Sequence, residues 1–255
     1  GTKILSSVRW SQTEHAVWGG IVPNLARRAH EERIDQIIEQ TMSNAQCLIS
    51  NVDAIAVTVG PGLAVALGVG IAKAKELAEK YHKPLIAVNH IEGHILSALV
   101  ITTPLPPPTL GGGGPQVGGG TLALVVSGGH TELILVEEIG KYKILAEKID
   151  DALGEALDKA ARMLGLGYPG GVLLEKAAAL GNPKKYNLPR PMAGRENQNQ
   201  FSYSGLKSAF FRLVQKEGIK DINDLAASFQ HRAFEHLIRI TRNSISNFKF
   251  QISNL

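Results

Sequence analysis

The sequence has a single cysteine, Cys47, and few aromatic residues in 255 positions. One thiol cannot close a disulfide within the chain, and it cannot build a zinc site from several cysteines. We therefore expect a protein of a reducing compartment. Aromatic residues make up 5% of the chain and hydrophobic residues 44%, so aliphatic side chains must dominate the core of an ordinary soluble globular protein.

Long hydrophobic runs are also missing. The apolar windows Leu63–Ala72 and Leu122–Val126 are far shorter than the ~18 uncharged residues of a membrane span, and the first is rich in glycine. The sequence therefore predicts no membrane partner.

Acidic residues become scarce towards the C-terminal end. Residues 1–180 hold 15 Lys and Arg against 18 Asp and Glu, whereas residues 181–255 hold 12 against 5. A basic C-terminal third indicates a surface for a polyanion such as nucleic acid. A solvated face that only aids solubility is an equal alternative. The residues in question are Lys184, Lys185, Arg190, Arg195, Lys207, Arg212 and Lys216, together with Arg27, Arg28 and Arg33.

The first part of the chain, residues 1–100, has the pattern of an α/β lobe. Residues 52–59 predict a buried strand, residues 63–80 a helix and residues 84–88 a second buried strand. Strand, helix and strand in this order predict a parallel pair with a crossover helix. An amphipathic helix is expected upstream, over residues 25–42.

A Pro/Gly-rich stretch, residues 101–120, predicts a flexible surface insertion and marks the best candidate for a domain boundary. The second lobe, residues 121–255, begins with a predicted hairpin of strands 121–126 and 131–137 around a Gly-Gly turn. A further strand is expected at 143–148. Helices are expected over 151–164 and 172–180, and from about residues 205 and 224.

Two histidines, His90 and His94, form the most specific local pattern. Asn89 can cap a helix over residues 90–99, which places both imidazoles on one helical face where they can share a cation. Such a pair is often purely structural. Glu92 is rotated about 200° from the first histidine, so it is poorly placed as the general base of a zinc protease, and a third metal ligand would have to come from elsewhere.

Two further segments suggest ligand contacts. The turn of Val125–Thr131 (VVSGGHT) has adjacent glycines that expose backbone N–H groups, and it can cradle a phosphate or simply form a tight hairpin. In the predicted helix 151–164, Asp151, Glu155 and Asp158 share a face. Their carboxylates either form ion pairs with Lys159 or Arg162, or one of them accepts a hydrogen bond from a ribose hydroxyl of a bound nucleotide.

Taken in order along nearly the whole chain, these segments resemble the universal family of tRNA threonylcarbamoyladenosine synthases (TsaD-like proteins). The matching segments are SQTE, GGIVPNLARRAH, VDAIAVTVGPGL, KPLIAVNHIEGHI, LVVSGGHTEL, DDALGEALDKAARMLGLGYPGG, PRPM, FSYSGLKSA and DLAASFQ. The resemblance implies an ASKHA (actin-like) fold with two lobes around a nucleotide cleft. It also implies transfer of the threonylcarbamoyl group from threonylcarbamoyl-adenylate to N6 of adenosine 37, in tRNAs that read codons beginning with A.

The resemblance also implies roles for individual residues. His90 and His94 match the family's metal ligands, with zinc or iron as the metal. The adenylate contacts match Val125, Val126, Ser127, Gly128, Gly129, Asp158, Gly171 and Glu175. The basic lobe would hold the anticodon stem-loop of tRNA. Because the adenylate is already activated, we assign no nucleophile or general base. A homodimer or accessory proteins of the modification pathway are further expected partners.

The chain departs from the family pattern at both ends, which predicts weak or no transfer activity. It has neither the opening GIETSCDD strand nor the later GGVAAN element and the aspartate that completes the metal site. Two alternatives therefore stay open, a metal-dependent glycoprotein endopeptidase and a non-catalytic paralogue that acts as a binding module. The SGGHT and GYPGG segments resemble the bacterial and mitochondrial branch, and the insertion favours a mitochondrial location over the bacterial cytoplasm.

Overall fold

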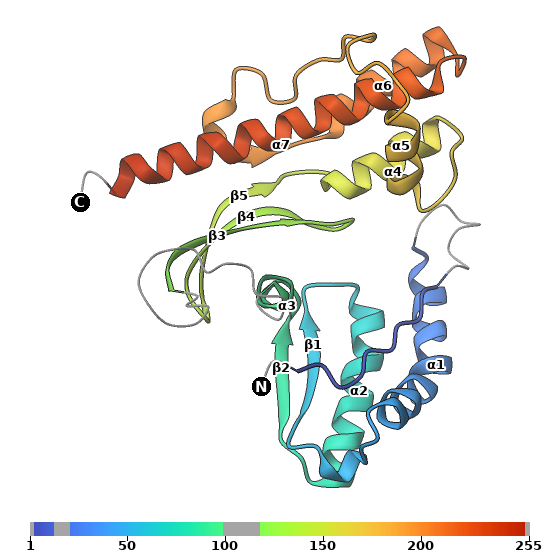
Figure 1. The fold of residues 1–255 in the computed structure, drawn as a ribbon, viewed down its shortest axis with the longest axis vertical. Coiled ribbons are helices and arrows are strands. Elements are labelled where there is room, and N and C mark those ends of the chain that lie inside the picture. The colour runs from blue at the N-terminus through green and yellow to red at the C-terminus, as the bar shows by residue number, and fades with distance from the viewer. Residues whose placement is uncertain (1–2, 13–20, 99–117, 253–255) are drawn as a thin grey trace. The chain divides into compact units, whose positions relative to one another are not determined.

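The computed structural model describes residues 3–12, 21–98 and 118–252 and divides into two compact units, Gly1–Gln116 and Val117–Leu255 (Figure 1). Each unit is described by itself. The described residues form an α/β fold, as predicted, with a two-stranded sheet in the first unit and a four-stranded sheet in the second. Every helix among them is too short or too polar to cross a lipid bilayer.

The first unit contains the predicted parallel strand pair. Strand β1 (Ile55–Gly60) pairs in parallel with β2 (Leu85–Asn89), and helix α2 (Ala64–Tyr81) makes the crossover. The β-branched residues of β1 favour an extended backbone, and the run ends at Gly60 and Pro61. The strand begins three residues later than predicted, because the short 3₁₀ helix η2 (Ile49–Asn51) precedes it and pairing starts only at Ile55.

Two other helices complete this unit. Helix α1 (Pro23–Asn44) packs against α2, and Lys73 of α2 forms an ion pair with Asp35 of α1 at 3.0 Å. The shorter helix α3 (His90–Ser97) follows β2 directly. Trp10 lies upstream of these helices, and the guanidinium of Arg33 sits 4.9 Å from its ring centroid.

The second unit is built on a sheet in the order β3-β4-β5-β6. The predicted hairpin is present as β3 (Gly118–Val126) and β4 (Thr131–Glu138), and β5 (Lys141–Lys148) continues it in antiparallel fashion. The short β6 (Gln200–Phe201) pairs in parallel with β5. Residues 118–120, which we assigned to the flexible insertion, instead begin β3, and the rest of the insertion lies outside the described residues.

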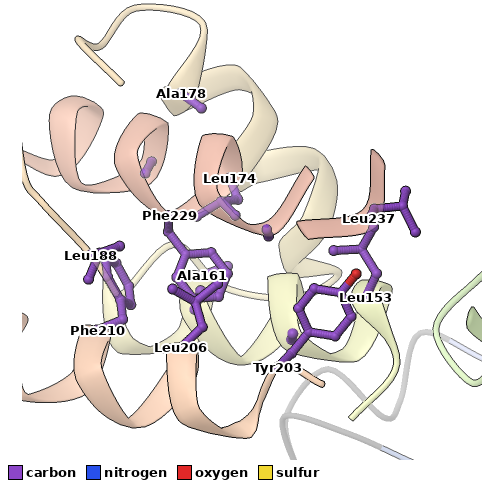
Figure 2. Close-up of a cluster of buried hydrophobic side chains, with 14 of the residues drawn as sticks. Leu153, Ala161, Leu174, Ala178, Leu188, Tyr203, Leu206, Phe210, Phe229 and Leu237 are labelled. Carbon is purple, nitrogen blue, oxygen red and sulfur yellow. The ribbon is translucent and has the colours of Figure 1, made fainter. Parts of the chain in front are cut away.

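Four helices form a core together with Leu133 of β4 and Ala146 of β5, and the last of the four contacts β5 and β6. They are α4 (Leu153–Met163), α5 (Gly170–Ala178), α6 (Ser204–Glu217) and α7 (Ile222–Ile252). In Figure 2, Tyr203 just before α6 and Leu206 and Phe210 within it point into a cluster with Phe229 of α7 and Leu174 of α5. This aliphatic and aromatic cluster is the core of the second unit.

Asp151 corrects one sequence prediction. We placed it within the helix that contains Glu155 and Asp158, but α4 begins at Leu153, so Asp151 lies outside the helix. Its carboxylate binds Lys159 at 2.7 Å, which is one of the partners expected from the sequence, and also Lys207 of α6 at 2.5 Å. Burial opposes ionisation of this carboxyl, but the two lysines together hold its pKa below the usual range. Asp151 therefore joins α4 to α6.

The neighbouring Asp150 fixes the start of α6. Its side chain accepts hydrogen bonds from the hydroxyls of Ser202 and Ser204, at 2.5 and 2.6 Å, and from the backbone N–H groups of Tyr203 and Ser204. Burial again opposes ionisation, and these donors lower the pKa of Asp150 on balance. The bonds satisfy N–H groups at the helix start that have no partner within the helix.

Candidate functional site

A pocket of about 320 Å³ lies in the second unit, where the β3–β4 turn meets the starts of α4 and α5. Its walls are mostly apolar, and Asp158 is the only charged residue among them. Val126, Val172 and Phe234 are 41%, 54% and 38% exposed although they line this pocket. Exposed apolar side chains that gather in a hollow indicate a surface for a ligand. The remaining lining residues are Ser127, Gly128, Leu153, Gly154, Leu157, Pro169 and Gly171.

The β3–β4 turn is tied to α4 by hydrogen bonds. The buried hydroxyl of Thr131 accepts from the N–H of Leu153 at 2.8 Å, and the carbonyl oxygen of Ser127 accepts from the N–H of Gly154 at 3.2 Å. A Cβ at Gly154 would lie only 2.6 Å from that carbonyl oxygen. The helix can therefore approach the turn this closely only because residue 154 is glycine.

The turn offers fewer N–H donors to a phosphate than its sequence suggested. The hydroxyl of Ser127 accepts from the backbone N–H groups of Gly129 and His130, at 3.2 and 3.0 Å. The hydroxyls of Ser127 and Thr131 are thus used within the turn and at the start of α4. In contrast, a Cβ at Gly128 or Gly129 would have nothing within 4 Å, so packing does not require glycine at either position.

Asp158 fixes the opposite wall of the pocket. Its carboxylate oxygen Oδ1 accepts from the N–H of Gly171 at 2.8 Å, which joins α4 to the first turn of α5. Gly170 makes the close approach possible, since a Cβ there would lie 2.6 Å from the Cβ of Ala161. A carboxylate has about four lone-pair sites, so Asp158 keeps acceptor capacity for a ligand.

The structure brings together five of the eight residues that we assigned to adenylate contacts: Val126, Ser127, Gly128, Asp158 and Gly171 all line the pocket. Val125 is 8% exposed and belongs to the buried residues, and Gly129 lies in the turn beyond the lining. Glu175 is exposed, one turn along α5 from Gly171.

Several lining residues were not assigned from the sequence. Gly154 sits in a segment that we quoted, DALGEALDKAARML, and a glycine near the start of a predicted helix was a usable signal for close packing. Phe234 lies far along the chain in α7 and has no local signal. Only the fold brings it to the β3–β4 turn.

The two histidines lie in the first unit, on α3. The side chain of Asn89 accepts from the N–H groups of Ile91 and Glu92, at 2.8 and 3.2 Å, so the predicted helix cap is confirmed. The Nε2 atoms of His90 and His94 are 3.2 Å apart, and their ring centroids are 4.5 Å apart.

This geometry fits two ligands of one cation. Two nitrogens bound ~2.1 Å from a tetrahedral zinc ion lie about 3.4 Å apart. The same distance also fits a hydrogen bond between two neutral imidazoles. Within the described residues, no group of three or more His, Cys, Asp and Glu side chains is placed to hold a metal ion. The pair thus offers two nitrogen ligands of the right type and spacing for a metal ion, and a complete metal site requires further ligands.

Several of the basic side chains that we assigned to a polyanion surface form ion pairs with carboxylates of the protein. Lys185 binds Asp221 and Asp224 at 2.7 and 2.8 Å, Arg190 binds Glu235 at 3.0 Å, and Lys207 binds Asp151. These bonds hold the loop before β6 and the start of α6 in place. Lys207, whose side chain is only 24% exposed, thus has an ion pair within the fold, and contact of these cations with nucleic acid stays a prediction.

Comparison with known proteins places this arrangement in a family. The family model described as "TsaD: tRNA N6-adenosine threonylcarbamoyltransferase" matches residues 3–252. A Bartonella bacilliformis protein named tRNA N6-adenosine threonylcarbamoyltransferase is 47% identical over 92% of this chain and 62% of its own length. Proteins of the same name from Sphingopyxis alaskensis and Dictyoglomus turgidum are 44% and 45% identical, over 94% and 100% of this chain and 65% and 73% of their own lengths.

The chain thus spans 62% of the length of the Bartonella relative and 65% of the length of the Sphingopyxis relative. The match to the family model extends over both units and includes the α3 histidines as well as the pocket. The chain therefore belongs to the TsaD family of tRNA N6-adenosine threonylcarbamoyltransferases.

Proposed function

We propose that this protein acts in tRNA modification, by transfer of the threonylcarbamoyl group from threonylcarbamoyl-adenylate to N6 of adenosine 37. The observation that carries this proposal is the apolar pocket with a single carboxylate, Asp158, in a chain of the TsaD family. The names of the relatives describe the same transfer to tRNA adenosine. We further propose that the two units are the two actin-like lobes of the ASKHA fold.

The pocket suits the nucleoside part of the adenylate. Its volume of about 320 Å³ and its apolar walls can accommodate a purine, and Val126, Val172 and Phe234 would become covered. Asp158 can accept hydrogen bonds from ribose hydroxyls. A phosphate is disfavoured beside this carboxylate by like-charge repulsion, and the N–H groups of Gly129 and His130 already donate to Ser127. We therefore assign adenosine, and not the phosphate, to this pocket.

Adenosine is the ligand used to test this assignment. Because it carries no charge, its affinity does not depend on where the phosphate of the adenylate binds. Asp158→Asn is expected to weaken adenosine binding about tenfold, since hydrogen bonds to a charged acceptor are worth ~1.5–3 kcal/mol. Asparagine can still accept from the N–H of Gly171, so the fold should be retained. The dissociation constant is measured by isothermal titration calorimetry.

Glu155→Gln is the matched control, because Glu155 lies on the same helix and its carboxylate binds Lys159 outside the pocket. Its adenosine affinity should equal that of the wild type. Glu175→Gln in the same series decides whether this exposed residue contacts the nucleotide. Equal adenosine affinity in wild type and Asp158→Asn would overturn the assignment of the pocket.

His90 and His94 would hold a divalent cation, zinc or iron, through their Nε2 atoms. A bound cation of this kind supplies Lewis-acid stabilisation of negative charge on a carbonyl or phosphate oxygen. The imidazoles must be neutral to bind it, and their placement on one turn of α3 depends on the Asn89 cap. The metal-ligand role of the pair is part of our proposal.

A His90→Ala/His94→Ala variant is expected to lose most of the zinc bound by the purified protein, because both nitrogen donors are removed. Metal content is measured by inductively coupled plasma mass spectrometry after dialysis against zinc. His231→Ala, which removes an exposed histidine of α7, is the control and should keep the metal. Equal zinc content in the double variant and the wild type would rule out this site.

A further inference from the structure

Helix α6 has two different faces. Leu206 and Phe210 are 1% and 0% exposed and point into the core of the second unit, as Figure 2 shows. The opposite face carries Ser208, Phe211, Arg212, Gln215 and Lys216, all of which are exposed. These five residues are called the α6 outer face below.

The charges of the α6 outer face are compensated differently from those of Lys185, Arg190 and Lys207. Lys185, Arg190 and Lys207 are held by carboxylates of other elements. Arg212 and Lys216 instead stand four residues apart on the same helix and repel each other. The only acidic residue in the α6 sequence is Glu217, which binds Lys216 at 3.3 Å while the lysine is 81% exposed. A screened pair of this kind leaves the face positively charged.

Phe211 gives this charged face an aromatic platform. Its side chain is 47% exposed, whereas the neighbouring Phe210 is fully buried. Arg212 directly follows it, and Lys216 lies one turn beyond Arg212, about 6 Å along the helix axis. An exposed aromatic ring flanked by cations is the arrangement with which proteins bind single-stranded nucleic acid: bases stack on the ring and cations contact the phosphates.

We propose that the α6 outer face binds a single-stranded segment of the tRNA, with an unpaired base on Phe211 and neighbouring phosphates on Arg212 and Lys216. The side-chain amide of Gln215 can donate hydrogen bonds to the same backbone. This inference rests on the proposed function, because that function makes tRNA the substrate. It deepens that function by naming one surface for the RNA and by separating this surface from the adenosine pocket.

The test measures tRNA binding and adenosine binding on the same set of full-chain variants. Arg212→Gln/Lys216→Gln is expected to weaken binding of a tRNA transcript about tenfold at 0.1 M salt. It should also reduce the slope of log affinity against log salt by about 1.4, since each single-strand phosphate contact contributes about 0.7. Phe211→Ala should weaken binding about tenfold, and Phe211→Tyr should preserve it because the stacking ring is kept.

Lys75→Gln/Lys176→Gln removes two exposed charges of α2 and α5 and serves as the control for net charge. It should keep the wild-type tRNA affinity. All α6 variants should bind adenosine as the wild type does. The unfolding temperature of Arg212→Gln/Lys216→Gln should be unchanged because these side chains are exposed.

Three outcomes would contradict the inference, and they differ in what they imply for the proposed function. If the wild type binds tRNA and the α6 variants bind it equally well, the inference is wrong and the proposed function stands. If the wild type binds no tRNA while it binds adenosine, both the tRNA substrate and this inference are overturned. If the variants keep tRNA affinity but change the sedimentation coefficient, the face is a protein interface and the inference is again wrong.

Discussion

Replacing Gly154 with alanine is expected to lower the free energy of unfolding by about 2–3 kcal/mol. The added Cβ would lie 2.6 Å from the carbonyl oxygen of Ser127 and 2.9 Å from the nitrogen of Gly128, which are both backbone atoms. A backbone contact of this kind cannot be relieved by a side-chain rotation. The β3–β4 turn or the start of α4 must therefore move, and the hydrogen bond from Gly154 to Ser127 is weakened.

Gly128→Ala is the matched variant. A Cβ at Gly128 would meet no atom within 4 Å, so the free energy of unfolding should be unchanged, or raised by up to about 1 kcal/mol through the unfolded state. Because Gly128 lines the pocket, the added methyl group should nevertheless weaken adenosine binding about tenfold. Urea unfolding measures the stability of the two variants, and calorimetry measures their adenosine affinity. The two measurements thus separate Gly154, which is required for folding, from Gly128, which is required for ligand binding. Equal stability of Gly154→Ala and wild type would contradict the close approach of α4 to the turn.

Lowering the pH from 6.5 to 4 is expected to cost the protein up to about 3 kcal/mol of stability through His236 of α7. Its side chain is 1% exposed, and burial together with the nearby Arg239 lowers its pKa to about 4, although Asp150 partly opposes the shift. The ring nitrogen Nε2 accepts from the N–H of Ser202, and Nδ1 lies 3.1 Å from the Arg239 guanidinium. Both ring nitrogens thus lie next to hydrogen-bond donors, which disfavours a second proton on the ring.

The direction of the pH effect follows from these pKa values. Unfolded histidine titrates near pH 6.5, so between about pH 6.5 and 4 the unfolded chain binds a proton that the folded chain does not bind. Stability from this group is complete above pH 6.5 and decreases as the pH falls through that window. Asp150 contributes mainly below this window, because its pKa is lowered from a value that already lies below 4.

Urea unfolding at pH 7, 5.5 and 4.5 measures this effect. In His236→Gln the amide oxygen can still accept from Ser202, so the free energy of unfolding should depend less on pH than in the wild type. The control is His231→Gln, which changes an exposed histidine five residues earlier on α7 and should keep the wild-type pH dependence. A wild type and a His236→Gln variant with the same pH dependence would contradict the prediction.

The sequence predicted the local features of both units well. The β3–β4 hairpin and the Asn89 cap of α3 depend on residues that are close along the chain, and the parallel β1–β2 pair follows from the order strand, helix, strand. Boundaries were less accurate where two signals competed. Asp151 has the periodicity of the α4 segment, but it lies before the helix start, where it binds Lys159 and Lys207.

The features that could not be predicted depend on residues far apart in the sequence. Asp150 binds Ser202 and Ser204, more than 50 residues away, and nothing in its local sequence indicates this role. Phe234 reaches the pocket only because α7 packs in the core of the second unit. The sequence also could not tell which cations are neutralised, since Lys185 and Arg190 meet carboxylates more than 35 residues away.

The bonds between the β3–β4 turn and α4 have a kinetic consequence for ligand binding. The Thr131 hydroxyl and the Ser127 carbonyl hold Leu153 and Gly154, so this wall of the pocket is already in place before any ligand arrives. A preformed wall needs no ordering step, and its conformational entropy is lost during folding and not during binding. Association with this unit should accordingly follow a single exponential whose rate rises linearly with nucleoside concentration, without the plateau of a slow rearrangement.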